Sequence, residues 1–405
     1  RTGEGLAFAS RALDADPTNE VAAREKAAAL KAIGDRAAES AWACEVLRAF
    51  PYDRGLVEPA LRACAEPATN EDRLAIYGGV AREWSGTDLA ASALGKLLRR
   101  DSSDAVLTSI VRLFLPRDPS WWGEARNWTY LAAQRPAVMA DPEVLGFLRE
   151  LWAAMSHDEG ETASNTRPWV AFALGRSLLA AKEWKQARSS LERAVSETAV
   201  LGSILARREL AEALARDGDP EAARRLREEA DVLEVVQKRP LDAREREIAR
   251  SVLPRVMFHE IRTLDGAVSN VAESGAGAEI WFIWSANCLV ARQQGSKLAG
   301  WIRSREVPAS LTFRWVQHDV PGLEATARER ATEWGLPASE VLLLPRGDAT
   351  LRRLGVIGTP WTLLVVDGFV LAERPGVFDS EWLQLAARLA EAWREPAQSA
   401  REEPK

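Results

Sequence analysis

The chain has 405 residues, of which 47% are hydrophobic and 28% are charged, and its formal net charge is -6 at pH 7. These values are typical of an ordinary globular protein with two or three domains. The negative net charge provides no general attraction to nucleic acid or to an anionic membrane. No run of 18 apolar residues occurs, so we expect no transmembrane segment in this chain.

Cysteine and histidine usage argues against a disulfide framework and against a metal site. Only three cysteines occur, Cys44, Cys64 and Cys288. The first two lie in alanine-rich helical segments, and we interpret them as separate core residues. The three histidines show no metal-ligand spacing, so no metal and no other cofactor is predicted. His259-Glu260 begins like a metalloprotease motif but lacks the second histidine, and we interpret it as a surface or strand pair.

Residues 1–235 are rich in alanine, leucine, arginine and glutamate. Their apolar residues recur every three or four positions, which predicts helices. One unit ends near Pro17 and the next near Pro51, 34 residues later, with Gly34 between them. Small and large residues alternate at helical spacing again from 169 to 234, for example at Gly175, Leu178, Trp184, Ala187, Leu191 and Ala194.

This period and this pattern resemble tetratricopeptide repeats. The resemblance implies a solenoid of stacked helix pairs over 1–235, whose surface binds protein partners. Because the chain starts at the second helix of such a repeat, we expect the native protein to extend upstream of Arg1, where an anchor could lie.

Tryptophan is unusually frequent, with 16 residues in the chain. The densest aromatic patch contains Trp121, Trp122 and Trp128. Such a cluster either packs between helices or lines a groove that holds a partner peptide. The sequence leaves both interpretations open, and we include the three tryptophans among the candidate binding residues.

A connector with one possible strand, Val256 to Arg262, is predicted over 236–277. From residue 278 to residue 394 strands alternate with helices, which predicts an α/β domain. Strands are expected at 278–284, 311–317, 340–344, 362–367 and 369–374, and helices at 287–303, 323–335, 348–354 and from Asp379 to Trp393. Residues 395–405 are expected to form a disordered tail. The predicted fold class is therefore a multidomain α plus α/β protein.

Two stretches of this second half resemble the thioredoxin fold. An apolar strand ends in Trp284-Ser285-Ala286-Asn287-Cys288 and is followed by a helix. Thr359-Pro360 precedes a predicted hairpin, at the place of the cis-proline that faces the active-site turn in that family. The Gly-Thr-Pro form and an additional segment between the strands resemble extracytoplasmic reductases of the TlpA type.

The sequence departs from the family at the first active-site cysteine, which is replaced by Ser285. In the family this cysteine is the attacking thiolate at the amino end of the helix, and the second cysteine resolves the mixed disulfide. Since Ser285 cannot form a disulfide with Cys288, dithiol cycling is excluded. Three interpretations remain: Ser285 caps the helix above a buried Cys288; Cys288 is a solitary reactive thiol; or the residues from Trp284 to Cys288, with Thr359 and Pro360, bind extended peptides without chemistry.

The favoured function is a non-catalytic scaffold or adaptor. It binds protein partners through the helical repeats and through the degenerate thioredoxin-like module. The alternative is a monothiol thiol-disulfide oxidoreductase or disulfide-handling chaperone that uses Cys288. The TlpA-type resemblance favours a bacterial cell envelope over the cytoplasm.

Overall fold

The computed structural model describes residues 2–65, 69–99, 101–158, 160–197, 204–256, 261–269, 277–319, 322–345, 351, 354, 356 and 359–394. The chain divides into two compact units, residues 1–190 and 191–405. The expected strand at 256–262 is described in part, whereas His259-Glu260, most of the expected helix at 348–354 and the tail 395–405 lie outside the described residues.

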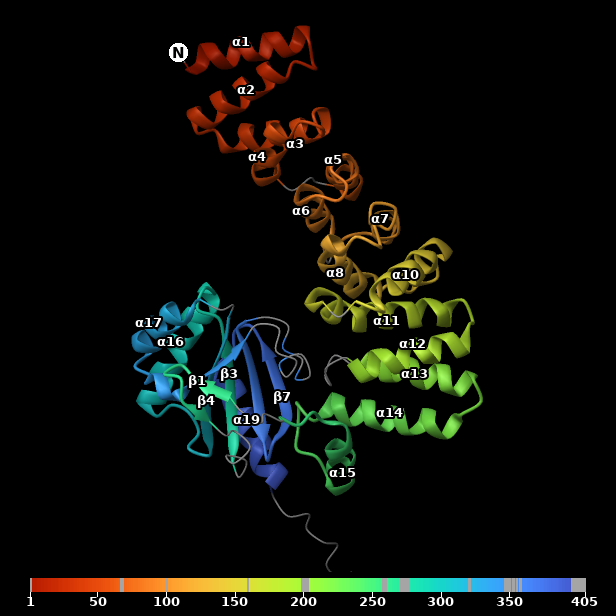
Figure 1. Ribbon diagram of the computed structural model, residues 1–405, viewed down its shortest axis with the longest axis vertical. Helices are drawn as coiled ribbons and strands as arrows, with labels where there is room; N and C mark the ends of the chain where they lie inside the picture. Colours follow the sequence, from red (N-terminus) through yellow and green to blue (C-terminus); the bar gives the residue numbers. More distant parts are fainter. Residues whose placement is uncertain are drawn as a thin grey trace, which may run out of the picture. The chain divides into compact units, whose positions relative to one another are not determined.

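The described residues of the first unit are helical, as the sequence predicts (Figure 1). Several helices pack against the next helix in the chain, as α1 does on α2 and α10 on α11, and the pair α3–α4 packs on the pair α5–α6. The helices are α1 (Thr2–Ala15), α2 (Glu20–Ile33), α3 (Arg36–Ala49), α4 (Arg54–Ala63), α5 (Asn70–Glu83), α6 (Asp88–Leu97), α7 (Asp104–Ile110), α8 (Trp122–Ala132), α9 (Pro136–Met139), α10 (Pro142–Met155) and α11 (Glu161–Ala180), with a 3-10 turn η1 (Pro119–Trp121). Helix α12 (Trp184–Glu197) spans the division between the units.

Short polar residues set the starts of these helices. The side chains of Asn19, Asp35 and Asp53 each accept a hydrogen bond from a backbone N–H in the first turn of α2, α3 and α4. Gly34 ends α2 with a φ of 81°, a left-handed conformation that favours glycine. These caps define the tight α2–α3 connection that the sequence places at Gly34.

The second unit contains helices α13 (Ile204–Arg216), α14 (Pro220–Val235) and α15 (Ala243–Val252), followed by a mixed sheet. The strands are β1 (Ile261–Thr263), β2 (Val268–Ser269), β3 (Ala278–Trp284), β4 (Leu311–Asp319), β5 (Val341–Pro345), β6 (Trp361–Val366) and β7 (Phe369–Pro375). Among the described residues they are accompanied by helices α16 (Leu289–Ser304), α17 (Glu324–Trp334) and α19 (Ser380–Arg394), with a 3-10 turn η3 (Ala338–Glu340).

The sheet order among the described strands is β2-β1-β5-β4-β3-β6-β7. Strand β3 lies inside the sheet, parallel to β4 and antiparallel to β6. All seven residues of β3 are buried, which explains why this strand is an almost continuous apolar run in the sequence. The order β3–α16–β4, then the hairpin β6–β7 and helix α19, agrees with the thioredoxin-like arrangement expected for 278–394.

One face of the sheet packs against α16, α17 and α19 in a large apolar cluster. Val232, Leu233 and Val236 at the end of α14, and Ala249 in α15, belong to the same cluster. The sequence-based boundary at residue 235 therefore does not coincide with the division into units, because α14 and α15 share the apolar core of the sheet.

The outer edge of β7 is covered by the segment that follows α15. The Val256 N–H donates to the Gly368 carbonyl at 2.8 Å, and the Val370 N–H donates to the Pro254 carbonyl at 3.1 Å. Arg255 also forms an isolated bridge with Phe369. This cover removes an open strand edge, which would otherwise be a template for pairing with another chain.

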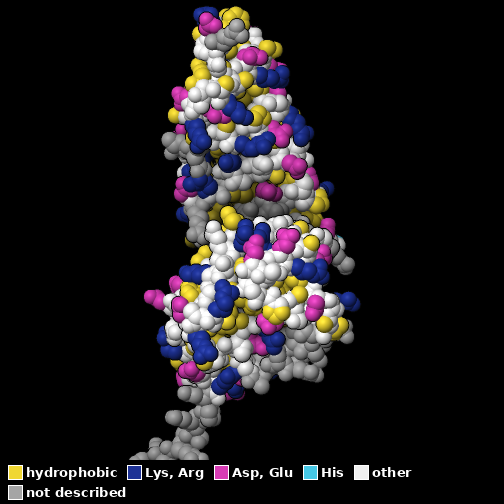
Figure 2. All heavy atoms as spheres, turned by 90° about the vertical axis from the view of Figure 1, so that its left-hand side faces the viewer, with side chains coloured by type: hydrophobic (Ala, Val, Ile, Leu, Met, Phe, Trp, Pro, Cys, Tyr) yellow, Lys and Arg dark blue, Asp and Glu magenta, His cyan; other side chains and the backbone are white. Residues whose placement is uncertain are grey.

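Charged side chains of both signs are spread over the surface that Figure 2 draws. Lysine and arginine are interspersed with aspartate and glutamate over the described residues of that face. Such a mixture gives no single-sign field that would attract a polyanion to this face.

Candidate functional site

The turn between β3 and α16 holds the free thiol of the chain. The Cys288 N–H donates to the Ser285 carbonyl at 3.1 Å, so residues 285–288 form a turn, and α16 begins at Leu289. Cys288 is the N-cap of α16, and its sulfur accepts a hydrogen bond from the Ala291 N–H at 3.4 Å. The interpretation that Ser285 caps the helix above a buried cysteine is therefore wrong, because the turn delays the helix start and leaves Cys288 half-buried.

The peptide bond between Thr359 and Pro360 is cis, as the resemblance implies. The Cys288 thiol donates to the Thr359 carbonyl at 3.4 Å. Residues 71 positions apart in the sequence thus meet at the amino end of α16. This contact unites the two stretches that the sequence identified separately.

Exposed apolar residues follow this thiol in the chain and also occur in a loop that is tied to the cis-proline. Leu289 and Val290, in the first turn of α16, are 66% and 43% exposed, and Val377, in the loop after β7, is 57% exposed. The Gly376 N–H donates to the Pro360 carbonyl at 2.9 Å, and the buried Gln294 of α16 donates to the Phe378 carbonyl at 2.8 Å. The loop is therefore tied both to the cis-proline and to α16. We call Leu289, Val290 and Val377 the apolar rim; no motif in the sequence marks any of them as a site residue.

The other predicted residues of the turn differ in their access to the surface. Asn287 is exposed and Ser285 is half-buried, whereas Ala286 and Trp284 are buried. The Trp284 ring packs edge-on against Trp334 of α17, with centroids 4.6 Å apart. Trp284 therefore belongs to the core beneath the site and offers no surface to a partner, which corrects its assignment as a binding residue.

Trp334 also explains a glycine in α16. A Cβ atom at Gly295 would overlap the Trp334 ring, so only glycine lets the helix approach this closely. Trp284, Trp334 and Gly295 together fix the position of α16 over the sheet, and hence the position of Cys288.

The tryptophans of the 121–128 patch are core residues as well. Trp121, Trp122 and Trp128 are all at most 3% exposed. The Trp128 indole packs edge-on against Phe147 at 5.2 Å and donates to the Leu107 carbonyl at 2.8 Å. Their assignment as partner-binding residues is therefore corrected: the cluster packs between helices of the first unit, where the Trp122 indole also donates to the Pro116 carbonyl at 3.1 Å.

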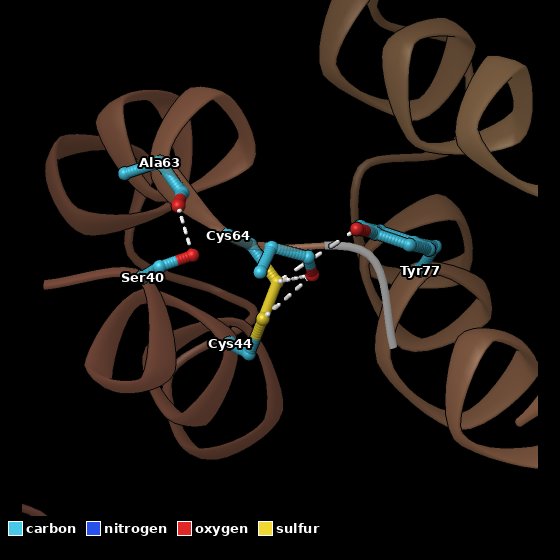
Figure 3. Close-up of a disulfide and its surroundings, with 6 residues drawn as sticks. Ser40, Cys44, Ala63, Cys64 and Tyr77 are labelled. Atoms are coloured by element: carbon cyan, nitrogen blue, oxygen red, sulfur yellow. Dashed lines mark hydrogen bonds between the residues drawn. A yellow bond between two sulfur atoms is a disulfide. The ribbon is translucent and has the colours of Figure 1, made fainter. Parts of the chain in front are cut away.

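Cys44 and Cys64 form a disulfide, which the sequence analysis did not predict (Figure 3). Cys44 lies in α3 and Cys64 is the C-cap of α4, and their Cα atoms are 4.8 Å apart. The Ala65 carbonyl oxygen lies 3.1 and 3.2 Å from the two sulfur atoms, and the Tyr77 hydroxyl donates to Cys64 at 3.7 Å. Both cysteines lie in helical segments as expected, but the two segments are antiparallel neighbours, so the thiols meet.

Glu373 is a titratable group on β7, two residues before the end of the strand. It lies opposite Leu363 of β6, and burial raises its pKa to about 7. The raised value means that folding favours the neutral carboxyl. Since the unfolded pKa is near 4.5, this group favours the folded state most at low pH, and its contribution is lost as the pH rises through about 7.

We expect Glu373→Gln to stabilise the second unit at pH 8 by about 2 kcal/mol and to have little effect at pH 5, because glutamine resembles the neutral carboxyl. Urea unfolding of the full chain at both pH values measures this difference. The exposed Glu381 provides the control, Glu381→Gln, which should show no comparable pH dependence. Equal effects of Glu373→Gln at pH 5 and pH 8 would contradict the prediction.

The described ranges contain neither a metal-binding cluster nor a membrane-spanning helix. No group of three or more His, Cys, Asp or Glu side chains there could hold a metal ion. None of the helices described is both long enough and apolar enough to cross a membrane.

No family model matches the chain, and no curated protein matches it. Solved structures resemble part of it. A secreted disulfide oxidoreductase of Mycobacterium tuberculosis is 14% identical with a TM-score of 0.27, and the match covers 34% of this chain and 97% of that one. A thiol:disulfide interchange protein of Chlorobium tepidum is 14% identical with a TM-score of 0.29, over 34% of this chain and 95% of that one. StoA of Bacillus subtilis is 12% identical with a TM-score of 0.26, and the match covers 31% of this chain and 93% of that one. At these identities and TM-scores the matches indicate no activity for this chain.

Proposed function

We propose that this chain binds extended polypeptides at the turn beside Thr359 and Pro360, and that Cys288 captures a bound polypeptide as a mixed disulfide. One observation carries the proposal. Cys288 is the one cysteine outside the disulfide, and it lies half-buried at the amino end of α16 in contact with the Thr359 carbonyl. This is the alternative function from the sequence, and the helix start at Leu289 favours it over a shielded thiol.

The capture step is a thiol–disulfide exchange. The Cys288 thiol loses its proton to solvent, and the sulfur attacks one sulfur of a disulfide in the polypeptide. A new S–S bond forms to Cys288, the disulfide of the polypeptide breaks, and its second sulfur leaves as a thiolate. Ser285 cannot resolve the product, so the complex is cleaved only by the released thiolate in the reverse reaction or by an external thiol.

The apolar rim supports a protein substrate. Three exposed apolar side chains beside one thiol would favour an apolar side chain next to the reacting cysteine. The backbone around Thr359 would pair with the extended segment, so that main-chain hydrogen bonds give affinity and the rim gives specificity.

The first unit is proposed as a second protein-binding surface. Its helices pack pair on pair, which supports the tetratricopeptide-like interpretation of 1–235 and the scaffold role. The protein would then hold partners through the helices and capture a cysteine through the thioredoxin-like module over 278–394.

The disulfide between Cys44 and Cys64 supports an oxidising compartment. Disulfides persist in secreted and periplasmic proteins and are rare in the cytosol. We therefore propose the bacterial cell envelope as the place of action, where disulfide-containing polypeptides would also be available for capture.

Incubation of the native protein with a cystine-bridged apolar peptide tests the thiol. We expect one peptide per chain, detected by intact mass and released by dithiothreitol, and none on Cys288→Ala. A peptide of the same length in which serines replace the apolar residues should react about tenfold more slowly, if contact with the rim contributes about 1.4 kcal/mol to the binding of the apolar peptide.

Two controls make the test specific. Leu289→Asp should slow the apolar peptide and leave the reaction with glutathione disulfide nearly unchanged, because the small probe does not need the rim. A wild-type protein that forms no adduct when folded, but forms one after unfolding in urea, would contradict the proposal and leave a binding role without chemistry.

A further inference from the structure

A groove lies between helices α2, α3 and α4 of the first unit. Its volume is about 580 Å³, within the range of sites that hold small ligands or a few side chains. The floor is apolar and buried, and consists of Trp42, Ala43, Val46, Leu56 and Ala60. The mouth carries exposed residues of all three helices, among them Arg24, Ala28, Lys31, Pro59 and Arg62.

The walls of this groove are held in place. The Trp42 indole donates to the Ala23 carbonyl at 3.3 Å and so joins α3 to α2. Arg24 forms an ion pair with Asp53, the N-cap of α4. The disulfide joins α3 to the end of α4 immediately beside the lining residues Ala43 and Ala63. These three ties keep the groove open without a ligand, so little conformational entropy would be lost on binding.

The charges at the mouth are mostly positive. Three of the four charged lining residues are cations, Arg24, Lys31 and Arg62, and the fourth is Glu39. Arg24 is engaged by Asp53 and by Glu20. Arg62 meets only the exposed Glu58, at 3.6 Å, and Lys31 has no carboxylate within ion-pairing distance among the described residues. Exposed pairs of this kind contribute little, so Lys31 and Arg62 are available to an incoming carboxylate.

We propose that this groove binds a polypeptide segment that carries carboxylates beside an apolar side chain. The apolar side chain enters the alanine-lined space over Trp42, where burial removes it from water. The carboxylates meet Lys31 and Arg62 at the mouth, and the negative charge of Glu39 opposes them, so binding should tighten when that charge is removed. The interaction weakens as salt concentration rises, because the charged groups are exposed.

The test uses fluorescence anisotropy with a labelled peptide of alternating glutamate and leucine. We expect saturable binding to the full chain and no binding of the matched peptide in which lysine replaces glutamate. Lys31→Glu should weaken binding about tenfold, and Glu39→Gln should tighten it about threefold. Lys96→Glu, an exposed substitution in α6 outside the groove, is the charge control and should bind like the wild type.

A second pair of variants tests the cavity itself. Ala28→Trp places a bulky ring at the mouth and should abolish binding, whereas Ala41→Trp, at an exposed position of α3 that does not line the groove, should leave it intact. Circular dichroism confirms that both variants fold. The proposal is overturned if the acidic peptide does not bind or if the basic peptide binds equally well. It is also overturned if Lys31→Glu binds the acidic peptide like Lys96→Glu, or if Ala28→Trp binds it like Ala41→Trp.

This groove is independent of the thiol. Cys288→Ala should bind the acidic peptide with unchanged affinity, and Lys31→Glu should still form the mixed disulfide. Failure of one proposal is therefore distinguishable from failure of the other.

Discussion

Replacement of both Cys44 and Cys64 by alanine is expected to destabilise the α3–α4 hairpin by about 3 kcal/mol. The two cysteines are 20 residues apart, and a cross-link of that length removes much of the freedom of the unfolded segment. Neighbouring hydrogen bonds add to the loss of stability in the double variant. The Ser40 hydroxyl donates to the Ala63 carbonyl at 2.8 Å, and Tyr77 donates to Cys64. These contacts depend on the same approach of α3 to the end of α4.

Hydrogen exchange of the α3 and α4 amides measures this loss locally. A change of about 3 kcal/mol corresponds to exchange roughly 100-fold faster in the double variant. Cys288→Ala leaves the disulfide in place and is the matched control. If the oxidised wild type, the reduced wild type and the double variant exchange at the same rate, the disulfide does not stabilise this hairpin.

The strands from β3 to β7 could be predicted closely, most clearly β3 and β6, which are buried on both faces, whereas β2 was not predicted. The continuous apolar runs of β3 and β6, Ala278 to Trp284 and Trp361 to Val366, clearly indicate buried strands. Asp367-Gly368 marks the hairpin between β6 and β7. The cis bond before Pro360 was implied by the resemblance to the thioredoxin fold, and the structure contains it. In these elements the local sequence and the tertiary packing agree.

The details of the site were harder to predict because they depend on a few backbone angles and on distant loops. A helix start after Ser285 and one after Cys288 bury the same apolar face of α16, so periodicity cannot separate them. The loop of Val377 is tied to the cis-proline through the hydrogen bond from the Gly376 N–H to the Pro360 carbonyl. No spacing in the sequence reports that contact.

Aromatic density was equally ambiguous. A run such as Trp121 to Trp128 has the same composition whether it lines a groove or fills a core. Whether such rings fill a core depends on the buried residues that they contact. These residues come from other helices, for example Phe147 of α10. The disulfide is a related case: Cys44 and Cys64 each have the surroundings of a core residue, and only the antiparallel packing of α3 on α4 brings them together.

Ser285→Cys is expected to create a disulfide with Cys288 and to restore dithiol chemistry. Residues 285 and 288 close a turn through the hydrogen bond from the Cys288 N–H to the Ser285 carbonyl at 3.1 Å. The ends of such a turn lie less than about 7 Å apart, which overlaps the Cα separations that disulfides require. The helix end, the cis-proline and the apolar rim are already present, so the substitution adds the missing second thiol to an otherwise complete site.

Thiol titration and insulin reduction measure this gain. Under mild oxidation the wild type should retain its one free thiol, and Ser285→Cys should retain none. With a small dithiol as reductant the variant should reduce insulin, whereas the wild type should not. Asn287→Cys is the matched control, because consecutive Cα atoms are only about 3.8 Å apart, below the usual span of a disulfide. If Ser285→Cys keeps two free thiols under oxidation, the turn holds residues 285 and 288 in a geometry that cannot bridge, and the loss of the first cysteine is then not the only barrier to dithiol chemistry.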